Sequence, residues 1–446
     1  MRNFKPKIIL IQPDSLFLAE PLSFPGLGLL YISAFLKQHG YEIEFYDLTG
    51  KLTLPGDLRA DIFGFSCQTV HLPFAARAVK ELRKNNPDSI FVVGGPCPTW
   101  SAQDCLDAGF DIVVRGEGEK SMLDIVGHFR DIQNARKQAK KFKQVYIPDC
   151  YLDINSIPFP DWEAIDIYRY RYQLAGRRCM SIITVRGSCP FGMGGNCRFC
   201  SKTDLGKPQP LRFRSADSVL EEVKILRDKY NFGSVMIYDD EILINKDRDT
   251  KIFEGLKKLD IKFRCMTRVN LATKEDLKKM KDCGCIEICI GAESGDPYIL
   301  EQVVKKGTTV EANTRFVKWC HEVGLNVKAY LIIGLPSEKR ESLELTYKWL
   351  KDAKPTNYDV SIYAPYPGSE FYDHKEKYEI DWDENALKKI WYTGEPQYGV
   401  PVVWTPYLTS KEISDFRDKI NNEFKRGLGG TTSYWGPISE NKEISR

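Results

Sequence analysis

A long alternation of strand-like and helix-like segments begins at Ser181-Ile182-Ile183-Thr184-Val185-Arg186-Gly187-Ser188-Cys189. The apolar and β-branched start of this stretch predicts a strand, and the glycine and serine that follow predict a loop. Five more strand-like runs follow, separated by amphipathic stretches of helix length. These runs are Ser234 to Tyr238, Lys262 to Met266, Cys285 to Ile290, Asn326 to Ile333 and Asp359 to Ala364. The alternation predicts a partial (β/α)6 barrel of the TIM type, whose functional residues lie at the carboxyl ends of the strands.

The residues before this barrel alternate in the same way. Their strand-like runs are Ile8 to Ile11, Glu42 to Tyr46, Ile62 to Phe65, Ile90 to Val93 and Ile112 to Val114. Five strands with helices between them predict a flavodoxin-like, doubly wound parallel sheet, so the whole chain belongs to the α/β class. Small residues follow three of these strands, at Ser66, Gly94-Gly95 and Gly116. They are either tight turns or places where the backbone approaches a ligand closely.

Changes in this alternation divide the chain into four parts. We expect an N-terminal domain over 1–145, a linker over 146–180 that contains Pro148, Pro158 and Pro160, a barrel over 181–376, and a small C-terminal helical region over 377–446. In the last part, Thr409 and Glu412 form a capping-box pattern. The helix that they start carries one apolar face, which is expected to pack on the barrel. That face consists of Ile413, Phe416, Ile420 and Phe424.

Composition limits the classes of function. Lys plus Arg number 64 and Asp plus Glu number 61 in a chain of 446 residues. This near balance offers no broad basic surface, so no nucleic-acid partner is expected. The apolar run after Lys7 breaks at Pro13, which is too early for a signal sequence or a membrane span and favours a cytoplasmic protein. In that compartment thirteen cysteines indicate metal binding rather than disulfide bonds.

Three of the cysteines lie in the loop after the first barrel strand. Cys189, Cys197 and Cys200 are separated by glycine-rich sequence that allows the three thiols to converge. A structural zinc or an electron-transfer cluster needs four ligands, so three thiols suggest a metal centre with one open position. Two alternatives stay open, which are zinc with Cys179 as the fourth ligand and reactive loop cysteines that bind no metal.

This loop resembles the cluster loop of the radical S-adenosylmethionine (SAM) superfamily. The resemblance implies that Cys189, Cys197 and Cys200 hold a [4Fe-4S] cluster and that SAM chelates its fourth iron. The usual spacing in the family is C-x3-C-x2-C, whereas this chain has C-x7-C-x2-C. The four extra residues, Gly192 to Gly195, are mostly glycine.

Later strand ends carry further motifs that are similar to those of the same family. The resemblance implies that an acidic motif after the second strand receives the SAM amino group, and that Arg268, with Arg315 as a second candidate, neutralises the SAM carboxylate. It also implies a ribose-binding motif after the fourth strand and an adenine-binding strand end after the fifth. The residues so implied are Asp239, Asp240 and Glu241 for the amino group, Glu293 and Ser294 for the ribose, and Phe199, Ile333, Gly334 and Pro336 for the adenine.

The N-terminal domain resembles the cobalamin-binding domain of the cobalamin-dependent class of radical SAM enzymes. Three stretches carry the resemblance, Pro25 to Leu30, Phe91 to Thr99 and Asp111 to Glu119. The histidine signature that supplies a ligand to cobalt in other cobalamin proteins is absent, and Cys97 stands where a histidine is usual. The cobalamin contacts that the resemblance implies are Ser66, Gly94, Gly95, Thr99, Gly116 and Glu117.

Together these resemblances imply SAM, a [4Fe-4S] cluster and cobalamin as cofactors. The activity they imply is reductive cleavage of SAM followed by methylation of an unactivated carbon of a small molecule, with electrons from a donor such as flavodoxin or ferredoxin. One alternative is a cobalamin-independent radical dehydration, dehydrogenation or cyclisation with a scaffold-only N-terminal domain. Another is a non-catalytic metal-binding or redox-sensing protein. Retention of cobalamin after loading and desalting tests the first alternative. Metal analysis tests the second, because four iron ions per chain and one zinc ion per chain are distinct results.

Overall fold

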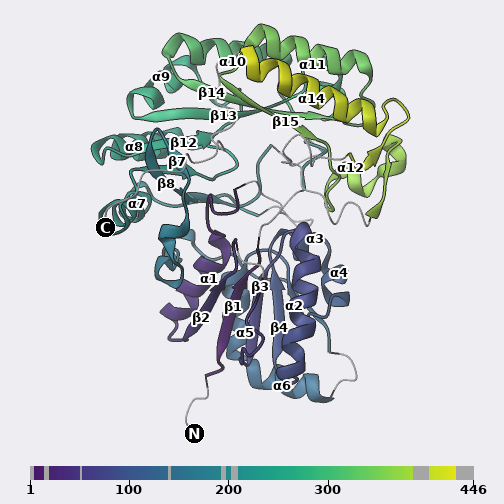
Figure 1. The fold of residues 1–446 in the computed structure, drawn as a ribbon. Helices are drawn as coiled ribbons and strands as arrows, with labels where there is room; N and C mark the ends of the chain where they lie inside the picture. Colours follow the sequence, from purple (N-terminus) through teal and green to yellow (C-terminus); the bar gives the residue numbers. More distant parts are fainter. Residues whose placement is uncertain are drawn as a thin grey trace.

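The computed structural model describes residues 5–14, 20–50, 53–138, 142–191, 197–201, 209–384 and 401–427. Two α/β bodies lie one above the other, the N-terminal sheet below and the curled second sheet above (Figure 1). The insertion Gly192 to Gly195 lies outside the described residues. So do three aromatic residues that the sequence suggests for substrate contact or packing, Trp391, Tyr392 and Tyr398.

The N-terminal body is the predicted doubly wound parallel sheet. Its described strands follow the order β2-β1-β3-β4-β5-β6, and every neighbouring pair is parallel. The sequence predicted the first five and missed β6, because Gln144-Val145-Tyr146 has no apolar run. The elements are β1 Ile8–Gln12, α1 Leu27–Gln38, β2 Ile43–Asp47, β3 Ile62–Ser66, α2 Leu72–Asn85, β4 Ile90–Gly94, α3 Pro96–Trp100, α4 Ala102–Asp107, β5 Ile112–Val114, α5 Gly118–Gly127, α6 Phe129–Gln138 and β6 Gln144–Tyr146.

Alternating side chains build a core on each face of this sheet. In β1, Ile9 and Ile11 join one buried cluster while Ile8 and Leu10 join another. Successive strand residues point to opposite faces, so an apolar run without polar breaks requires helices on both sides. This explains why β1, β3, β4 and β5 contain no charged residue, whereas the edge strand β2 carries Glu44 and Asp47.

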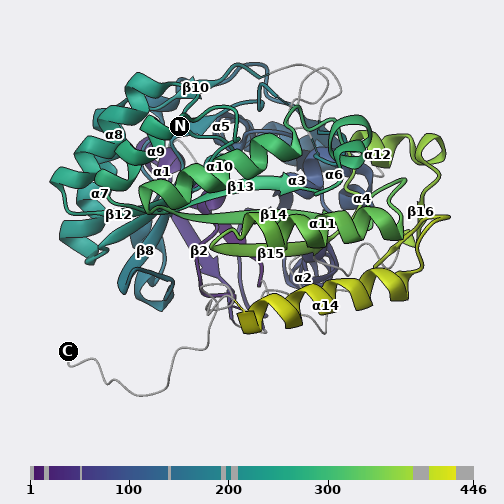
Figure 2. The ribbon, with the colours of Figure 1, turned by 90° about the horizontal axis from the view of Figure 1, so that it is seen from above.

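The second body is the predicted half-barrel. Its described strands follow the order β15-β14-β13-β12-β11-β8, all parallel, and β7 (Gln173–Leu174) pairs antiparallel at the β8 edge. The helices α7 to α11 cover its outer side (Figure 2). The elements are β8 Arg177–Ile182, α7 Ala216–Tyr230, β11 Ser234–Ile237, α8 Lys246–Lys258, β12 Lys262–Met266, α9 Lys274–Asp282, β13 Cys285–Glu293, a π-helix Ile299–Val303, α10 Val310–Val323, β14 Asn326–Ile333, α11 Arg340–Ala353 and β15 Asn357–Ile362.

One predicted strand was misplaced. The first barrel strand was expected over 181–185, but β8 begins at Arg177 and ends at Ile182. The start of β8 was not predicted because its first two residues are charged. In the structure Arg178 nevertheless lies in the strand, with its guanidinium stacked on the Phe232 ring at 4.2 Å. Val185 and Arg186 belong to a separate short strand, β9, which pairs with β10 (Arg212–Phe213).

The C-terminal helix packs as predicted. α14 (Ser410–Gly427) begins with the capping box, in which Glu412 N donates to Thr409 Oγ1 at 3.2 Å and Thr409 N donates to Glu412 Oε2 at 2.8 Å. All four residues of its apolar face are buried. Phe424 lies against the Tyr347 and Tyr358 rings at 5.4 and 5.9 Å, which covers the β15 edge of the half-barrel. Smaller described elements near it are α12 Glu370–Asp373, β16 Asp381–Trp382 and β17 Val403–Trp404.

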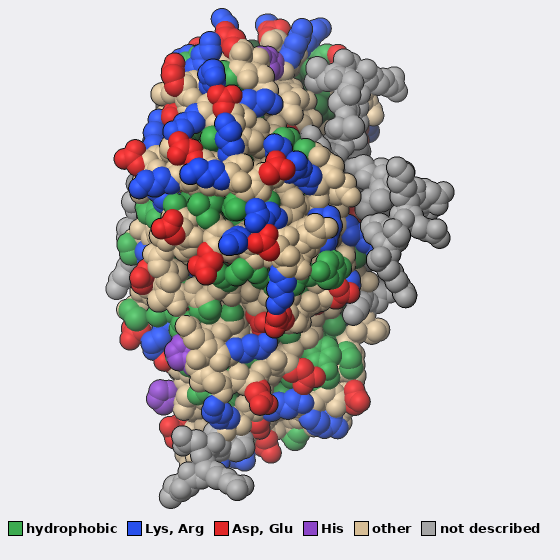
Figure 3. All heavy atoms as spheres, turned by 90° about the vertical axis from the view of Figure 1, so that its left-hand side faces the viewer, with side chains coloured by type: hydrophobic (Ala, Val, Ile, Leu, Met, Phe, Trp, Pro, Cys, Tyr) green, Lys and Arg blue, Asp and Glu red, His purple; other side chains and the backbone are tan. Residues whose placement is uncertain are grey.

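The surface carries both signs of charge. Figure 3 shows Lys and Arg side chains interspersed with Asp and Glu over one whole side of the molecule. Among the described residues, no helix combines the length and the apolar character that crossing a bilayer requires.

Candidate active site at the strand ends of the half-barrel

The loop that carries the three cysteines, here called the cluster loop, comprises the described residues Gly187–Phe191 and Cys197–Ser201. Its return half is held by backbone hydrogen bonds, in which Cys197 N donates to Lys305 O and Arg198 N donates to Val304 O, both at 3.0 Å. Cys200 N closes a turn on Cys197 O at 2.9 Å. The loop therefore rests on the segment that follows β13 and its π-helix.

The structure brings the three cysteines to one loop but not to one point. Cys197 and Cys189 lie near enough to Cys200 for their charges to act on its thiol. Within the described ranges, however, no three Cys, His, Asp or Glu side chains are grouped closely enough to hold an ion. All thirteen cysteines of the chain are described, and none is in a disulfide.

Arg268 lies beside the most buried of these thiols. Its Nη1 donates to Cys197 Sγ at 3.6 Å, its Nη2 donates to Lys306 O, and its guanidinium lies 4.4 Å from the centre of the Phe191 ring. Its Nε is buried with no hydrogen-bond partner among the described residues. The buried guanidinium therefore keeps one donor, Nε, for an anionic ligand.

The three predicted acidic residues have different surroundings. Asp239 is buried and accepts hydrogen bonds from Thr184 N at 2.6 Å and Val185 N at 3.1 Å, so its carboxylate ties β11 to the end of β8. Asp240 is exposed. Glu241 is partly buried, and its Oε2 has no partner within the described residues. Of the three, Glu241 is best placed to bind a cationic group.

Glu293 is paired with a lysine that the sequence analysis missed. Lys306 Nζ lies 2.8 Å from Glu293 Oε1, and both residues are buried. Burial alone would lower the pKa of Lys306, but the negative charges of Glu293, Cys197 and Glu241 together outweigh this effect and raise the pKa above its usual value. The Phe199 ring, partly buried, lies 5.9 Å from the same ammonium. Lys306 thus joins the cluster loop to the end of β13.

Other predicted residues are occupied within the protein. Ser294 is buried and lies 3.3 Å from Thr346 on α11. Ile333 O accepts a hydrogen bond from Tyr363 N at 2.8 Å, and Pro336 is buried in the turn that follows. The Tyr363 hydroxyl is buried without a partner in the described part of the chain. Arg315 is exposed on α10 and stacks on Trp319 at 5.4 Å, so it does not join this group.

The Gly334 turn is fixed by Glu338, which gives a prediction on stability. Glu338 Oε2 accepts from Gly334 N at 2.5 Å and Leu335 N at 3.2 Å, and burial raises the pKa of this carboxyl from 4.5 to about 8. Folding therefore takes up a proton between these values, so the stabilisation is full below pH 4.5 and declines as pH rises through about 8. Glu338→Gln should flatten this decline in urea unfolding midpoints measured across that range. An unchanged slope would show that another group causes it.

The carboxyl end of the N-terminal sheet is built from small residues. Gly95 has φ +112°, and a Cβ there would lie 2.8 Å from Cys67 O, so this backbone crossing requires glycine. Thr99 Oγ1 donates to Gly95 O at 2.8 Å and accepts from Gly116 N at 3.2 Å, which joins the turns after β4 and β5. Ser66 and Gly94 complete this edge as the last residues of β3 and β4.

Cys97 and Glu117 of this edge have partners within the protein. Cys97 is buried in the core of the N-terminal sheet, so its thiol is not presented to a ligand above the edge. Glu117 forms an ion pair with Arg212 of the upper body, in which Arg212 Nη1 donates to Glu117 Oε2 at 3.1 Å. The edge can accept a broad ligand over Ser66, Gly94 and Gly116, without an axial ligand from Cys97.

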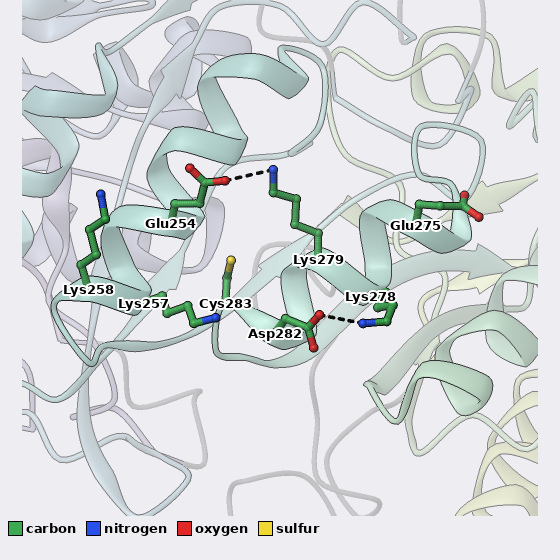
Figure 4. A pocket seen from close by; sticks show the side chains of 8 residues that line it. All are labelled: Glu254, Lys257, Lys258, Glu275, Lys278, Lys279, Asp282 and Cys283. Atoms are coloured by element: carbon green, nitrogen blue, oxygen red, sulfur yellow. Dashed lines mark hydrogen bonds and ion pairs between the residues drawn. The ribbon is translucent and has the colours of Figure 1, made fainter.

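A hollow of about 640 Å³ lies elsewhere, on the outer side between α8 and α9. Figure 4 shows that charged side chains line it, that the ion pair of Lys279 with Glu254 connects α9 to α8 across it, and that Lys278 pairs with Asp282 on α9 itself. Within each pair the two charges neutralise each other. The hollow lies on the helical layer and not at the strand ends. It therefore has no part in the site described above.

The donors around Cys197 fit an amino-acid-like cosubstrate beside a thiolate-bound metal centre. Glu241 Oε2 offers an acceptor and Arg268 Nε offers a donor, both buried without partners among the described residues. The ammonium and carboxylate of an amino acid complement them. A half-barrel with a three-cysteine loop and such a pair of groups defines the class of metal-dependent enzymes that bind a cosubstrate at the strand ends.

Comparison with known proteins agrees with this class. The profile of the radical SAM superfamily matches residues 185–350, and that of the B12 binding domain matches residues 21–126. An uncharacterised methyltransferase of Pyrococcus horikoshii is 30% identical over 87% of this chain and 85% of its own length. The anaerobic magnesium-protoporphyrin IX monomethyl ester cyclase of Rubrivivax gelatinosus is 28% identical over 78% of this chain and 66% of its own length.

A solved structure shares the whole architecture. The radical SAM methyltransferase TsrM from Kitasatospora setae, with cobalamin and a [4Fe-4S] cluster bound, matches at a TM-score of 0.69 and 13% identity, over 98% of this chain and 93% of that chain. The chain belongs to the radical SAM superfamily, of the class that carries an N-terminal B12 binding domain. SAM and a [4Fe-4S] cluster are therefore its cofactors.

Proposed function

We propose that this protein is a cobalamin-dependent radical SAM methyltransferase that methylates an unactivated carbon of a small molecule. The observation that carries the proposal is the position of the B12-binding domain, whose carboxyl edge faces the half-barrel (Figure 1). The relative from Pyrococcus horikoshii, which is named as a methyltransferase, supports it. We further propose that electrons come from a small donor protein such as a flavodoxin or ferredoxin.

When bound, the cluster and cobalamin supply the reductive cleavage of SAM and a transferable methyl group. The residues that would hold the cluster are Cys189, Cys197 and Cys200. Glu241 is proposed to accept a hydrogen bond from the SAM ammonium, while Arg268 donates to its carboxylate through Nε. Lys306 and Glu293 would neutralise each other until SAM binds and then orient it between them.

The protein also has to exclude water and stray hydrogen donors from a radical. The N-terminal domain stands over the strand ends, and α14 covers the β15 edge, where Phe416 and Ile420 are buried. The residues proposed to bind cobalamin through this edge are Ser66, Gly94, Gly95, Thr99 and Gly116. Their small side chains and backbone groups allow a flat ligand to lie close to the sheet.

Glu241 should make SAM binding depend on pH. Burial raises the pKa of this carboxyl from 4.5 to about 7, although Lys306 and Arg268 oppose the shift. The ionised carboxylate is the stronger acceptor for the amino group of SAM, so the affinity for SAM should rise as the pH increases toward 7 and level off above it. Glu241→Gln should bind SAM more weakly and with a flat pH profile. Equilibrium binding of SAM to the reconstituted protein from acid to neutral pH measures this, and a sloping profile in Glu241→Gln would refute the assignment.

A ring-forming oxidation is the second candidate function, because a relative of comparable identity is named as a cyclase. The two candidates differ in the products of SAM. Methyl transfer from SAM leaves S-adenosylhomocysteine in addition to deoxyadenosine, whereas a radical cyclisation leaves deoxyadenosine alone.

The test is to load the reconstituted protein with hydroxocobalamin, desalt it, and record the absorption that remains. SAM and a reductant are then added, and both nucleoside products are measured by mass spectrometry. Retained cobalamin together with S-adenosylhomocysteine is the expected result. Deoxyadenosine without retained cobalamin would reject the methyltransferase in favour of the second candidate.

A further inference from the structure

The two ends of the cluster loop are joined by a short antiparallel ladder. Arg186 pairs with Arg212 and Val185 with Phe213 in β9 and β10. The pairing continues into the loop, where Ser188 N donates to Gln209 O at 3.2 Å and Gln209 N donates to Ser188 Oγ at 2.9 Å. We call Val185–Ser188 with Gln209–Phe213 the base of the cluster loop.

The two arms of this base touch backbone to backbone. Gly187 has φ +123°, and a Cβ there would lie 2.4 Å from Pro210 O and 3.0 Å from Leu211 Cα. No side chain fits in this space, so the two arms are held to each other by backbone hydrogen bonds and not by packing between them. Side chains on the outside of the base connect it to the rest of the protein.

Those side chains are two arginines that face each other across the ladder. Arg186 and Arg212 are register partners, and like charges in that position repel. Each is paired instead with a carboxylate of the N-terminal domain. Arg186 Nη1 lies 2.7 Å from Glu119 Oε1, and Arg212 Nη1 lies 3.1 Å from Glu117 Oε2.

Both ion pairs are largely shielded from solvent, and each arginine makes a further contact. The exposed fractions of the side chains are 15% for Arg186 and 4% for Glu119, and 12% for Arg212 and 19% for Glu117. The Arg186 guanidinium also lies 4.7 Å from the Tyr31 ring of α1. Arg212 Nη1 in addition donates to Leu152 O at 2.8 Å. Shielded, charge-assisted pairs of this kind fix geometry more firmly than exposed ones do.

We propose that Glu117 and Glu119 are positioning residues that clamp the base of the cluster loop to the N-terminal domain. They lie two residues apart at the start of α5, which sets their carboxylates against the two arms of the ladder. The clamp would hold the three-cysteine loop and the cofactor-binding edge of the N-terminal sheet in one fixed relation; only this consequence rests on the proposed function. Glu117, which the sequence assigned to cobalamin, has this role instead.

The test is hydrogen–deuterium exchange of the cluster-loaded full-length chain, comparing Glu117→Gln/Glu119→Gln with the unaltered protein. Amide exchange in the base of the cluster loop should become at least about tenfold faster, because two unneutralised arginines then face each other. Exchange in β13 should stay unchanged. The matched control is Glu163→Gln, which removes an exposed ion pair with Lys229 at another surface and should alter neither region.

A charge-reversed pair separates positioning from general destabilisation. Glu119→Arg alone should accelerate exchange in the base, and Glu119→Arg combined with Arg186→Glu should restore slow exchange. Exchange in the base no faster in the double glutamine variant than in Glu163→Gln, or no rescue by the reversed pair, would overturn the clamp. Exchange is read without turnover, so a failure of methyl transfer in the unaltered protein would reject the proposed function and leave this result standing.

Discussion

Alanine at Cys189, Cys197 and Cys200 together should reduce bound iron and sulfide from about four of each per chain to near zero. The variant removes the three thiolates that are proposed to bind the iron ions of the cluster. Deoxyadenosine formation should fall below detection, because the electron that cleaves SAM has no route to it. Iron and sulfide analysis and the electron paramagnetic resonance spectrum of the reduced protein measure the effect.

The matched control is Cys150→Ala, which removes an exposed cysteine far along the chain from the cluster loop. It should keep its full iron and sulfide and its activity. A triple variant that retains iron and sulfide, or an unaltered protein that takes up one zinc ion in their place, would contradict the assignment of these cysteines.

Lys306→Met should give the second large effect. It leaves the Glu293 carboxylate buried without its partner, and breaking a buried ion pair in this way costs about 3–5 kcal/mol of stability. Affinity for SAM should fall by about 10- to 100-fold, the usual loss when a hydrogen bond to a charged group is removed. Urea unfolding of the apoprotein and equilibrium SAM binding measure the two losses separately.

A double variant distinguishes stability from binding. Lys306→Met with Glu293→Gln removes both charges and should recover most of the lost stability, because no uncompensated charge stays buried. It should not recover SAM binding. Lys229→Met is the control at an exposed pair, where solvent screens the charges and no measurable loss of stability is expected. Normal SAM affinity in Lys306→Met would remove this lysine from the site.

The architecture was predictable because buried strands are recognisable from short runs of apolar residues in the local sequence. β12 and β14 have the bounds that their apolar runs predict, and the order of strands in both sheets follows from strand–helix alternation. β6 was missed since its three residues pair only at an exposed edge. The start of β8 was missed because Arg177 and Arg178 are charged, and only the folded structure shows where their guanidinium groups pack.

The sequence predicted where the site residues lie better than it predicted what each residue does. Motif position put Arg268, Glu241 and Glu293 at the strand ends, where the structure has them. It did not indicate that Asp239 and Ser294 bond within the protein, since such bonds depend on neighbouring loops. Lys306 carries no local signal, because it reaches the site only when the segment after β13 folds back beneath the cluster loop.

The central claim is that this chain cleaves SAM reductively. The most direct measurement is the formation of 5′-deoxyadenosine by the anaerobically reconstituted protein with SAM and dithionite, followed by mass spectrometry. We predict deoxyadenosine and methionine from the unaltered protein, and neither from the triple cysteine variant. A protein that holds an intact four-iron cluster and binds SAM, yet forms no deoxyadenosine after its cluster is reduced, would contradict the account.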